Sequence, residues 1–445
     1  MLLGVLAQGA APAATRVPST DSWVGAWGYV GAPLPPGVSP PPAPPPGPPP
    51  ATQPVVVPLG APVAPASPLA PRPLPPPPLL ENPGNLAVDI AATDLSNLSL
   101  RQVVRVSAAG RRVRLRFSNE GGADTLTVGA VHIGEAEADG AVAAGTDHAV
   151  TFDGKPGVSI PASAPVLSDP IDLPIKVLDR LYISIYVPGV IPARPPLALF
   201  QYVAGSTGDF TGAARLPGAR LMRAPAYVTL VEVQPAAPTD VLVTLGDSIT
   251  EGAASTANAF RSWPDRLAER LAPRHWAVVN AGISGNRLLR YGAGPNALAR
   301  LDRDVLSVPG IKAIVLLEGI NDIGRGFTPA GPTEPVDAAA LEAADKQIIM
   351  RAHEHGIRII GATLTPYEGA AYASPAGEAV REELNTWIKT SGAFDGVIDF
   401  APAVADSANP RTFDKRYNER DHLHPNDSGY QAMADAVDLS LIAGK

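Results

Sequence analysis

The sequence predicts a two-part protein in which a β-sandwich or jelly-roll region precedes an α/β region built on a parallel sheet. Three observations predict this arrangement. The 445 residues exceed the size of one ordinary domain. Between residues 98 and 233, apolar and polar residues alternate with period two, as in half-buried strands. After residue 238, apolar strands alternate with helical segments, which is typical of a parallel sheet covered on both faces.

We expect the chain to divide into residues 1–20, 21–235 and 236–445. The first segment has an apolar run followed by small residues but no positive start, so it is either a remnant of a secretory signal or a disordered terminus. We favour the signal, which implies a periplasmic or secreted protein. Prolines crowd the stretch at about 32–80 and predict an extended insertion in the β region, acting as a loop or tether or as a ligand for a proline-binding module.

Turn residues bound a series of short strands in the β region. We expect strands at 101–106, 112–117, 126–133, 148–152, 181–187, 197–203 and 227–233. The small residues that end at Gly110 predict a hairpin between the first two strands. Arginines alternate along these two strands, and they form either a face for an anionic ligand or, more simply, the solvated face of half-buried strands. They are Arg101, Arg105, Arg112, Arg114 and Arg116.

The α/β region shows the same regularity at longer spacing. We expect strands at 241–245, 276–280, 311–317, 357–364 and 397–400, and helices at 263–271, 297–306, 338–355, 378–390 and 426–441. Ligands of such sheets bind beyond the carboxyl ends of the strands. The active residues should therefore lie in the loops that follow the strands.

Four of these loops carry residues that suit nucleophilic catalysis. A serine hydroxyl is a weak nucleophile, which needs a base and a site for the oxyanion. The loops contain Gly246-Asp247-Ser248, Asn280 to Asn286, Gly319-Ile-Asn321-Asp322 and Asp421-His-Leu-His424. Each residue also has a structural interpretation, such as a helix cap or a turn, but their joint occurrence at strand ends favours catalysis.

From about residue 240 to the end, these four blocks resemble the GDSL or SGNH hydrolase family in type and order. The resemblance implies a flavodoxin-like three-layer αβα fold. It also implies a catalytic triad and an oxyanion hole. The triad would be Ser248, Asp421 and His424, and the oxyanion donors would be Ser248, Gly285 and Asn321. Ile249 stands where the family usually has leucine, a change that keeps the apolar volume.

The upstream segments SWVGAWG and RQVVRVSAAGRRVRLRFSNE also resemble the β-rich leader of some two-domain bacterial members. In the second half of the chain, the chemistry of the residues agrees with what the resemblance implies. His424 would take the proton of Ser248 and return it to the leaving alcohol, while Asp421 orients the imidazole. The backbone N–H groups of Ser248 and Gly285 and the side-chain amide of Asn321 would hold the oxyanion.

Other polar residues are expected to play supporting roles or none. Asp247 should pin its loop by hydrogen bonds, and His422 should be a surface or supporting residue. His353 and His355 lie two apart on a predicted helix, share no face and lack a third ligand, so we expect no metal there. No nucleotide-binding motif occurs, and we expect no cofactor.

The predicted function is that of a cofactor-independent serine esterase that works through an acyl-enzyme. We expect a small-molecule or carbohydrate ester as substrate, with a short acyl group such as acetyl. Arylesterase or lipase-like hydrolysis, acyl transfer, and carbohydrate binding with vestigial activity are the alternatives. A net charge of −8 without a basic cluster argues against nucleic acid as a partner, and no apolar run is long enough for a membrane span.

The loops at 365–374 and 409–420 carry four aromatic residues that should shape the pocket or pack the loops. They are Tyr367, Tyr372, Phe413 and Tyr417.

Overall fold

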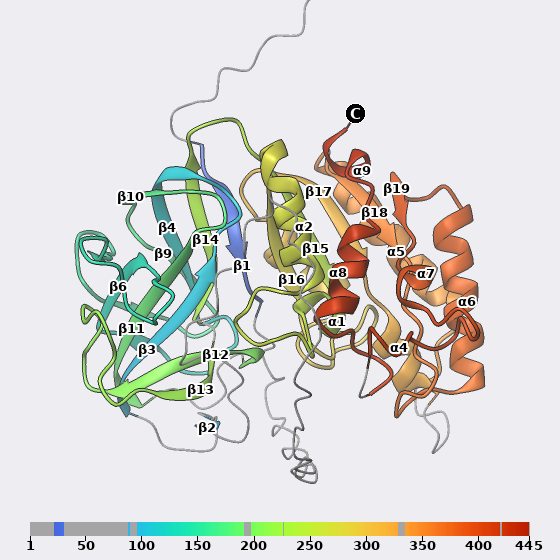
Figure 1. Ribbon diagram of the computed structural model, residues 1–445, viewed down its shortest axis with the longest axis horizontal. Coiled ribbons are helices and arrows are strands. Elements are labelled where there is room, and N and C mark those ends of the chain that lie inside the picture. Colours follow the sequence, from blue (N-terminus) through green and yellow to red (C-terminus); the bar gives the residue numbers. More distant parts are fainter. Residues whose placement is uncertain are drawn as a thin grey trace, which may run out of the picture.

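The computed structural model describes residues 22–30, 88–89, 96–190, 197–225, 227–327, 334–418 and 421–444 (Figure 1). The expected segment 1–20 and nearly all of the insertion at about 32–80 lie outside these residues, so the expectations for them stay predictions. Where the chain is described, β sheets from the first half adjoin an α/β part from the second half (Figure 1).

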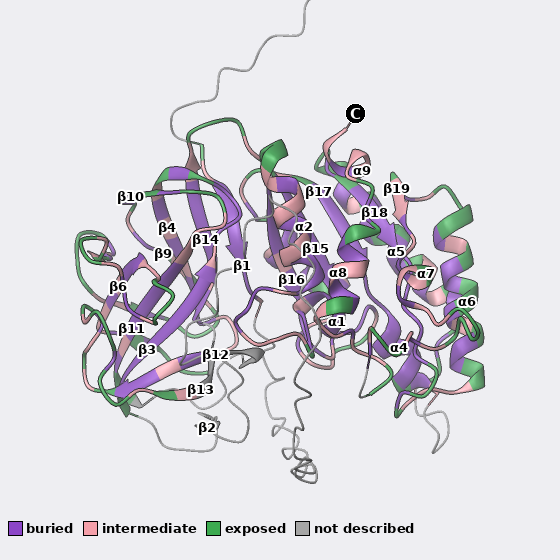
Figure 2. Cartoon of the chain, in the orientation of Figure 1, coloured by how far each residue is buried: buried purple, intermediate pink, exposed green. Residues whose placement is uncertain are grey.

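The first part consists of two large sheets and a two-stranded one, and their strands are mostly antiparallel. One sheet has the order β1-β14-β4-β10 with β9 beside β4, and the other has the order β2-β13-β12-β3-β11-β6-β7, while β5 pairs with β8. Apolar side chains from both sheets are buried in one core. Strand β1 of one sheet and β3 of the other are coloured mostly as buried (Figure 2). The strands are β1 Val24–Gly28, β2 Val88–Asp89, β3 Ser96–Arg105, β4 Gly110–Ser118, β5 Leu126–Val128, β6 Ala130–Glu135, β7 His148–Ala149, β8 Val158–Ile160, β9 Pro165–Leu167, β10 Ile171–Ile175, β11 Arg180–Val190, β12 Leu197–Thr207, β13 Arg220–Pro225 and β14 Val228–Pro235. The expected β-sandwich is confirmed.

The expected hairpin at Gly110 is wrong. Strand β3 pairs with β11 and β12, whereas β4 pairs with β14 and β10 in the other sheet. Residues 106–109 therefore carry the chain from one sheet to the other. Alternation of apolar and polar residues identified both strands, but it does not specify their partners, because two strands can face the same core from opposite sheets.

The arginines on β3 and β4 are neither a free anionic-ligand face nor simply solvated. Arg101 is 4% exposed and donates to the Ser184 hydroxyl (2.8 Å) and to the Ala214 carbonyl (2.9 Å). Arg105 reaches the second part of the molecule, where it pairs with Glu269 at 2.6 Å. The other three pairs lie within the β part, and they are Arg112 with Asp172, Arg114 with Glu232 and Arg116 with Glu120.

The second part is a parallel sheet with helices on both faces. Its strands are β15 Asp240–Gly246, β16 Trp276–Gly282, β17 Ile311–Leu317, β18 Arg358–Ala362 and β19 Gly396–Ile398. Their order, β16-β15-β17-β18-β19, is the flavodoxin-like order, and all neighbours are parallel. The predicted fold class is confirmed for this part. None of the helices in the described ranges has the length and apolarity that a membrane crossing requires.

The helices follow the sequence signals closely, with a few differences at their ends. They are α1 Ser248–Glu251, α2 Trp263–Leu271, α3 Ala297–Leu301, α4 Ile320–Gly326, α5 Ala338–Glu354, α6 Pro375–Thr390, α7 Phe400–Val404, α8 Asp427–Asp435 and α9 Ser440–Ala443, with a 3₁₀ turn at Ala272–Arg274 and a π turn at Asp302–Leu306. Short helices α4 and α7 were not expected. The helix expected at 426–441 is divided into α8 and α9, and between them the Asp438 side chain accepts the Ser440 N–H at 2.9 Å.

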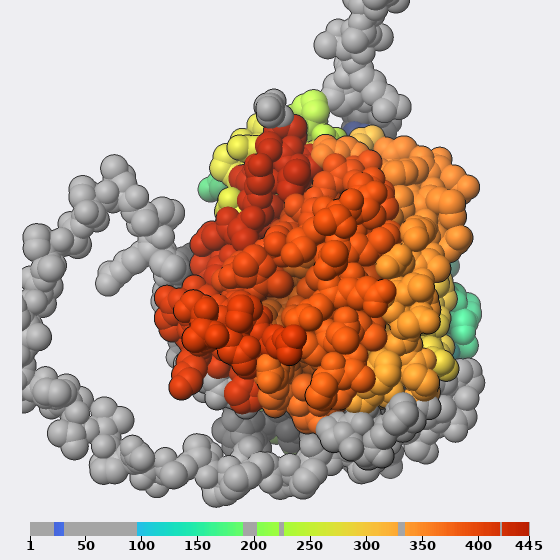
Figure 3. Space-filling view, turned by 90° about the vertical axis from the view of Figure 1, so that its right-hand side faces the viewer, coloured from blue at the N-terminus to red at the C-terminus, as the bar shows by residue number. Residues whose placement is uncertain are grey.

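Helix α2 packs on β16, and α5 packs on β18. Ser262 begins α2 with a capping box that includes Asp265. Viewed from the end opposite the β-sandwich, the surface comes from the C-terminal half of the chain (Figure 3).

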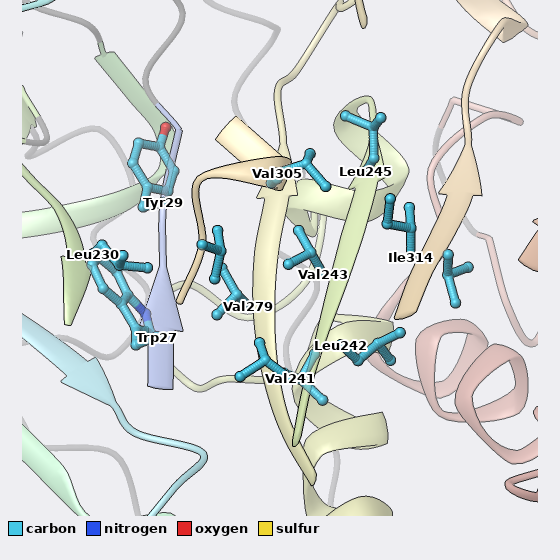
Figure 4. Close-up of a cluster of buried hydrophobic side chains, with 14 of the residues drawn as sticks. Trp27, Tyr29, Leu230, Val241, Leu242, Val243, Leu245, Val279, Val305 and Ile314 are labelled. Carbon is cyan, nitrogen blue, oxygen red and sulfur yellow. The ribbon is translucent and has the colours of Figure 1, made fainter. Parts of the chain in front are cut away.

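The two parts meet where β1 lies beside β16. The Ser107 hydroxyl donates to the Ala26 carbonyl (2.7 Å) and accepts the Val278 N–H (2.9 Å), which bridges the two strands. Apolar side chains continue across the junction, where Trp27 and Leu230 lie next to Val279 (Figure 4). One apolar core thus runs through both parts.

Candidate active site

Ser248 is placed at the edge of the parallel sheet by the end of β15. The strand stops at Gly246, and α1 begins two residues later with Ser248 as its first residue. Asp247 caps this helix, because its Oδ1 accepts the Ile249 N–H at 2.8 Å. Asp247 therefore pins the loop, which is the role expected from the sequence. Ser248 itself is 6% exposed.

Ser248 lies at one end of a chain of hydrogen bonds that also includes His424 and Asp421. The Ser248 Oγ is 2.8 Å from His424 Nε2, and His424 Nδ1 is 2.6 Å from Asp421 Oδ2. The other oxygen of Asp421 accepts the N–H groups of Leu423 and His424 at 3.0 Å each. Burial opposes ionisation of Asp421, but these bonds from His424 and Leu423 outweigh it and hold the pKa of the carboxyl well below its usual range. An ionised Asp421 can orient the imidazole.

The segment that carries His424 is fixed to the loop after Ser248 by helix α8. The Asp427 carboxylate accepts from the N–H of Thr256 and from Arg261, both at 2.7 Å. Further along α8, the Tyr430 hydroxyl donates to the Ala253 carbonyl at 2.6 Å. These contacts position the base relative to the serine.

The three expected oxyanion donors come from three neighbouring strand ends. Gly246 of β15 lies in register with Gly282 of β16 and with Leu317 of β17. Ser248, Gly285 and Asn321 follow these positions by two, three and four residues. The parallel register therefore brings the donors to the same edge of the sheet.

Two of these donors are held by local contacts. Gly285 has a φ of +74°, a conformation that favours glycine. The preceding Ser284 N–H donates to Glu251 at 2.7 Å, and Glu251 also accepts from the Tyr29 hydroxyl at 3.1 Å. Asn321 is 5% exposed on α4 and donates from Nδ2 to the carbonyl oxygen of Asn286 at 3.0 Å. A residue of the β-sandwich thus contacts the same glutamate that holds the Gly285 loop.

The model of the GDSL-like Lipase/Acylhydrolase family matches residues 244–432, a range that includes each of these catalytic and oxyanion positions. Residues 244–432 are a GDSL-like lipase/acylhydrolase (SGNH) domain. The family comprises carboxylic ester hydrolases, so the protein is an esterase or acylhydrolase. The resemblance found in the sequence is confirmed. The domain is preceded by the β-rich part described above.

The solved structures that are similar to this chain share little sequence identity with it. One is a GDSL-like lipase from Bacteroides thetaiotaomicron, with 18% identity, a TM-score of 0.33, and coverage of 45% of this chain and 87% of that one. Another is an acetyl xylan esterase, with 22% identity, a TM-score of 0.35, and coverage of 44% and 96%. A family two carbohydrate esterase from Cellvibrio japonicus has 13% identity, a TM-score of 0.34, and coverage of 77% and 87%. No curated protein matches the chain.

A buried arginine of the SGNH domain makes hydrogen bonds at the ends of β15 and β16, near the loops that carry the expected site residues. Arg300 is 1% exposed and donates to the carbonyls of Gly246 (2.9 Å) and Ala281 (2.7 Å) at the ends of β15 and β16. Its Nε donates to the Asn286 side chain at 2.9 Å. It also faces two buried carboxylates, Asp304 at 3.4 Å and Glu318 at 3.9 Å. Arg300 was not predicted from the sequence, although an arginine on the buried side of a predicted helix is a recognisable signal.

The Asp247 carboxyl should make the stability of the protein depend on pH. Burial raises its pKa to about 7, against about 3.9 in an unfolded chain. At pH values between these two pKa values, Asp247 keeps its proton in the folded protein and has released it in the unfolded chain. The Asp247 contribution therefore makes the free energy of unfolding fall as pH rises from about 4 to about 7.

We expect Asp247→Asn, which keeps the acceptor for Ile249, to make that fall shallower. Urea unfolding at several pH values between these limits measures the slope. The exposed Asp435→Asn is the control and should keep the slope of the wild type. An unchanged slope in the Asp247 variant would contradict the assignment of the buried proton.

Asn321→Ala should lower kcat by about 100-fold or more and change KM little. The amide is expected to bind the oxyanion more strongly in the transition state than the carbonyl in the ground state. Steady-state kinetics with p-nitrophenyl acetate separate the two constants. A loss that appears in KM alone would remove Asn321 from the oxyanion hole.

Several residues considered in the sequence lie away from the chemistry. His422 is exposed, His353 binds Asp395 at 2.9 Å, and His355 binds the Arg351 carbonyl at 2.9 Å. In the part of the chain that the structure describes, no group of three or more potential metal-ligating side chains is found.

The aromatic residues expected around the pocket have different surroundings. Tyr367 and Phe413 are buried in the core at 0% and 4% exposure, and Tyr417 packs against the same core. Tyr372 lies against an expected site residue, since its hydroxyl is 3.3 Å from Asn321 Oδ1.

Proposed function

We propose that the SGNH domain hydrolyses short acyl esters, acetyl esters above all, of carbohydrates or small alcohols through an acyl-enzyme. The observation that carries this proposal is the uninterrupted chain from the Ser248 hydroxyl through His424 to Asp421, at 2.8 and 2.6 Å. Such a chain activates a serine for attack on a carbonyl.

Ser248 Oγ would form a bond to the ester carbonyl carbon while His424 Nε2 takes the hydroxyl proton. The carbonyl oxygen becomes an oxyanion held by the donors at Ser248, Gly285 and Asn321. When the intermediate collapses, the bond to the alcohol breaks and His424 protonates the leaving oxygen. Water then attacks the acyl-enzyme with His424 again as the base, which releases the acid and restores Ser248.

The surroundings of the site support a short acyl group. Ser248 and Asn321 are only 6% and 5% exposed, so these side chains lie in a largely covered site. Among the described residues, the large exposed apolar side chains lie on separate segments of the chain. They are Leu167, Val177, Tyr291 and Met350.

An exposed tyrosine supports a sugar as the alcohol part of the ester. Tyr291 is 46% exposed and follows Gly285 in the same loop. This loop folds back on itself, since a Cβ on Gly292 would lie 3.6 Å from the Gly285 carbonyl oxygen. A partly exposed aromatic ring on the loop that carries Gly285 suits stacking on a sugar ring.

A comparison of esters tests this proposal. The full chain is assayed with p-nitrophenyl acetate, butyrate and octanoate, beside acetylated xylan as a carbohydrate ester. We expect kcat/KM to fall with acyl length and acetate to be released from the xylan. A preference for octanoate would favour a lipase-like activity instead. Release of acyl-sugar products when free sugars are added would indicate acyl transfer.

A further inference from the structure

Tyr372 lies against the side chain of Asn321, although the two residues come from different strand ends. The tyrosine belongs to the loop between β18 and α6, and Asn321 belongs to α4 after β17. Its hydroxyl is 3.3 Å from Asn321 Oδ1. Its ring packs flat on α4 at Gly324, where a Cβ would lie 2.3 Å from a ring carbon. The lack of a side chain at this position allows the ring to approach.

The Asn321 amide has two N–H groups and one oxygen. Its hydrogen bonds in the described structure account for the oxygen and for one N–H. One N–H of the amide donates to the Asn286 carbonyl, which can only accept. The amide oxygen accepts from the Tyr372 hydroxyl. The second N–H is then left to point at the oxyanion, and the two partners together oppose rotation of the amide about its last bond.

The Tyr372 hydroxyl is suited to act as a permanent donor. Burial, together with the nearby Asp247 carboxyl, raises the pKa of this hydroxyl well above its usual range. It therefore keeps its proton across the pH range in which esterases are assayed. A donor on the amide oxygen also polarises the amide, which strengthens donation from the opposite nitrogen.

We propose that Tyr372 is a positioning residue of the oxyanion hole, whose hydroxyl orients and polarises the Asn321 amide for the transition state. This inference rests on the proposed esterase function. Tyr372 acts through Asn321 and need not touch the substrate. Its effect should thus appear in kcat and should depend on the presence of Asn321.

The same loop provides a matched control. The ring of Tyr367 lies 6.1 Å from that of Tyr372, tilted by 51°, and Tyr367 is fully buried. Tyr367→Phe removes the same atom from the same loop without removing a bond to Asn321.

The first experiment compares Tyr372→Phe and Tyr367→Phe in the full chain with p-nitrophenyl acetate. We expect Tyr372→Phe to lower kcat about 10-fold, as loss of one hydrogen bond does, with KM within about twofold of the wild type. Tyr367→Phe should keep both constants within about twofold. Equal kcat values for the two variants, or a change in KM alone, would overturn the inference.

The second experiment repeats Tyr372→Phe in the Asn321→Ala background. If the hydroxyl acts through the amide, the double variant should be no slower than Asn321→Ala alone. A further loss of about 10-fold would show that Tyr372 acts elsewhere and would overturn the inference. If the wild type fails to hydrolyse esters, or if Ser248→Ala hydrolyses them equally well, the proposed function fails and the inference fails with it. An active, Ser248-dependent enzyme that is indifferent to Tyr372→Phe rejects the inference alone.

Discussion

Ser248→Ala is expected to lower ester turnover by about 10⁶-fold while the protein stays folded. The change removes the oxygen that would bond to the ester carbonyl, and no other hydroxyl is joined to His424 in the described structure. The fold should survive because the Ser248 side chain makes one hydrogen bond there, to the partly exposed His424. The measurement is kcat with p-nitrophenyl acetate, with circular dichroism to check folding.

Ser255→Ala is the matched control for this variant. Ser255 lies in the loop that follows α1 and donates to the Gly252 carbonyl at 2.7 Å, away from the base. It should keep the turnover of the wild type within about twofold, as a substitution outside the chemistry does. If Ser248→Ala and Ser255→Ala were equally active, the nucleophile would have to be another residue.

Arg300→Leu is expected to destabilise the protein by about 3–5 kcal/mol, because it removes one partner from a buried group of charges. Glu318 would lose its buried cation, Asp304 would keep Arg303 alone, and the carbonyls of Gly246 and Ala281 would lose their donor. Leucine cannot replace any of these contacts. Urea unfolding followed by tryptophan fluorescence measures the free energy of unfolding.

A neighbouring arginine separates this effect from the loss of any positive charge. Arg303 pairs with the same Asp304 at 2.5 Å, but its side chain is 26% exposed. Arg303→Gln should therefore cost no more than about 1 kcal/mol, as partly solvated pairs do. If the two variants lost equal free energy of unfolding, the hydrogen bonds of Arg300 to the strand ends would add no stability beyond that of a partly solvated ion pair.

The positions of Ser248, Gly285, Asn321 and His424 could be predicted because each lies in a short motif directly after a recognisable element. A parallel sheet collects strand ends at one edge, so motifs that are far apart in the chain come together without knowledge of any tertiary contact. The flavodoxin-like fold was implied by the resemblance to the family. The structure joins Ser248 to His424 and brings the loops of Ser248, Gly285 and Asn321 to the same edge of the sheet, and their catalytic roles await the experiments above.

Tyr372 and Arg300 could not be assigned their contacts from the sequence, since these contacts join different elements. Nothing local to Tyr372 distinguishes it from Tyr367, yet only Tyr372 reaches Asn321. The hairpin at Gly110 failed for a related reason, because the partner of a strand depends on the whole sheet arrangement. Such relationships are decided by packing between segments and have no signature in one short stretch.

The bridge that Ser107 makes between β1 and β16 has a consequence for how the protein reaches its native state. Strand β16 ends the parallel sheet, and the border of a sheet is normally a place where foreign chains can attach. Here a strand from the start of the chain shields that border. The border of the hydrolase half is therefore covered only when the N-terminal half packs against it, and we expect the two halves to unfold in one cooperative transition.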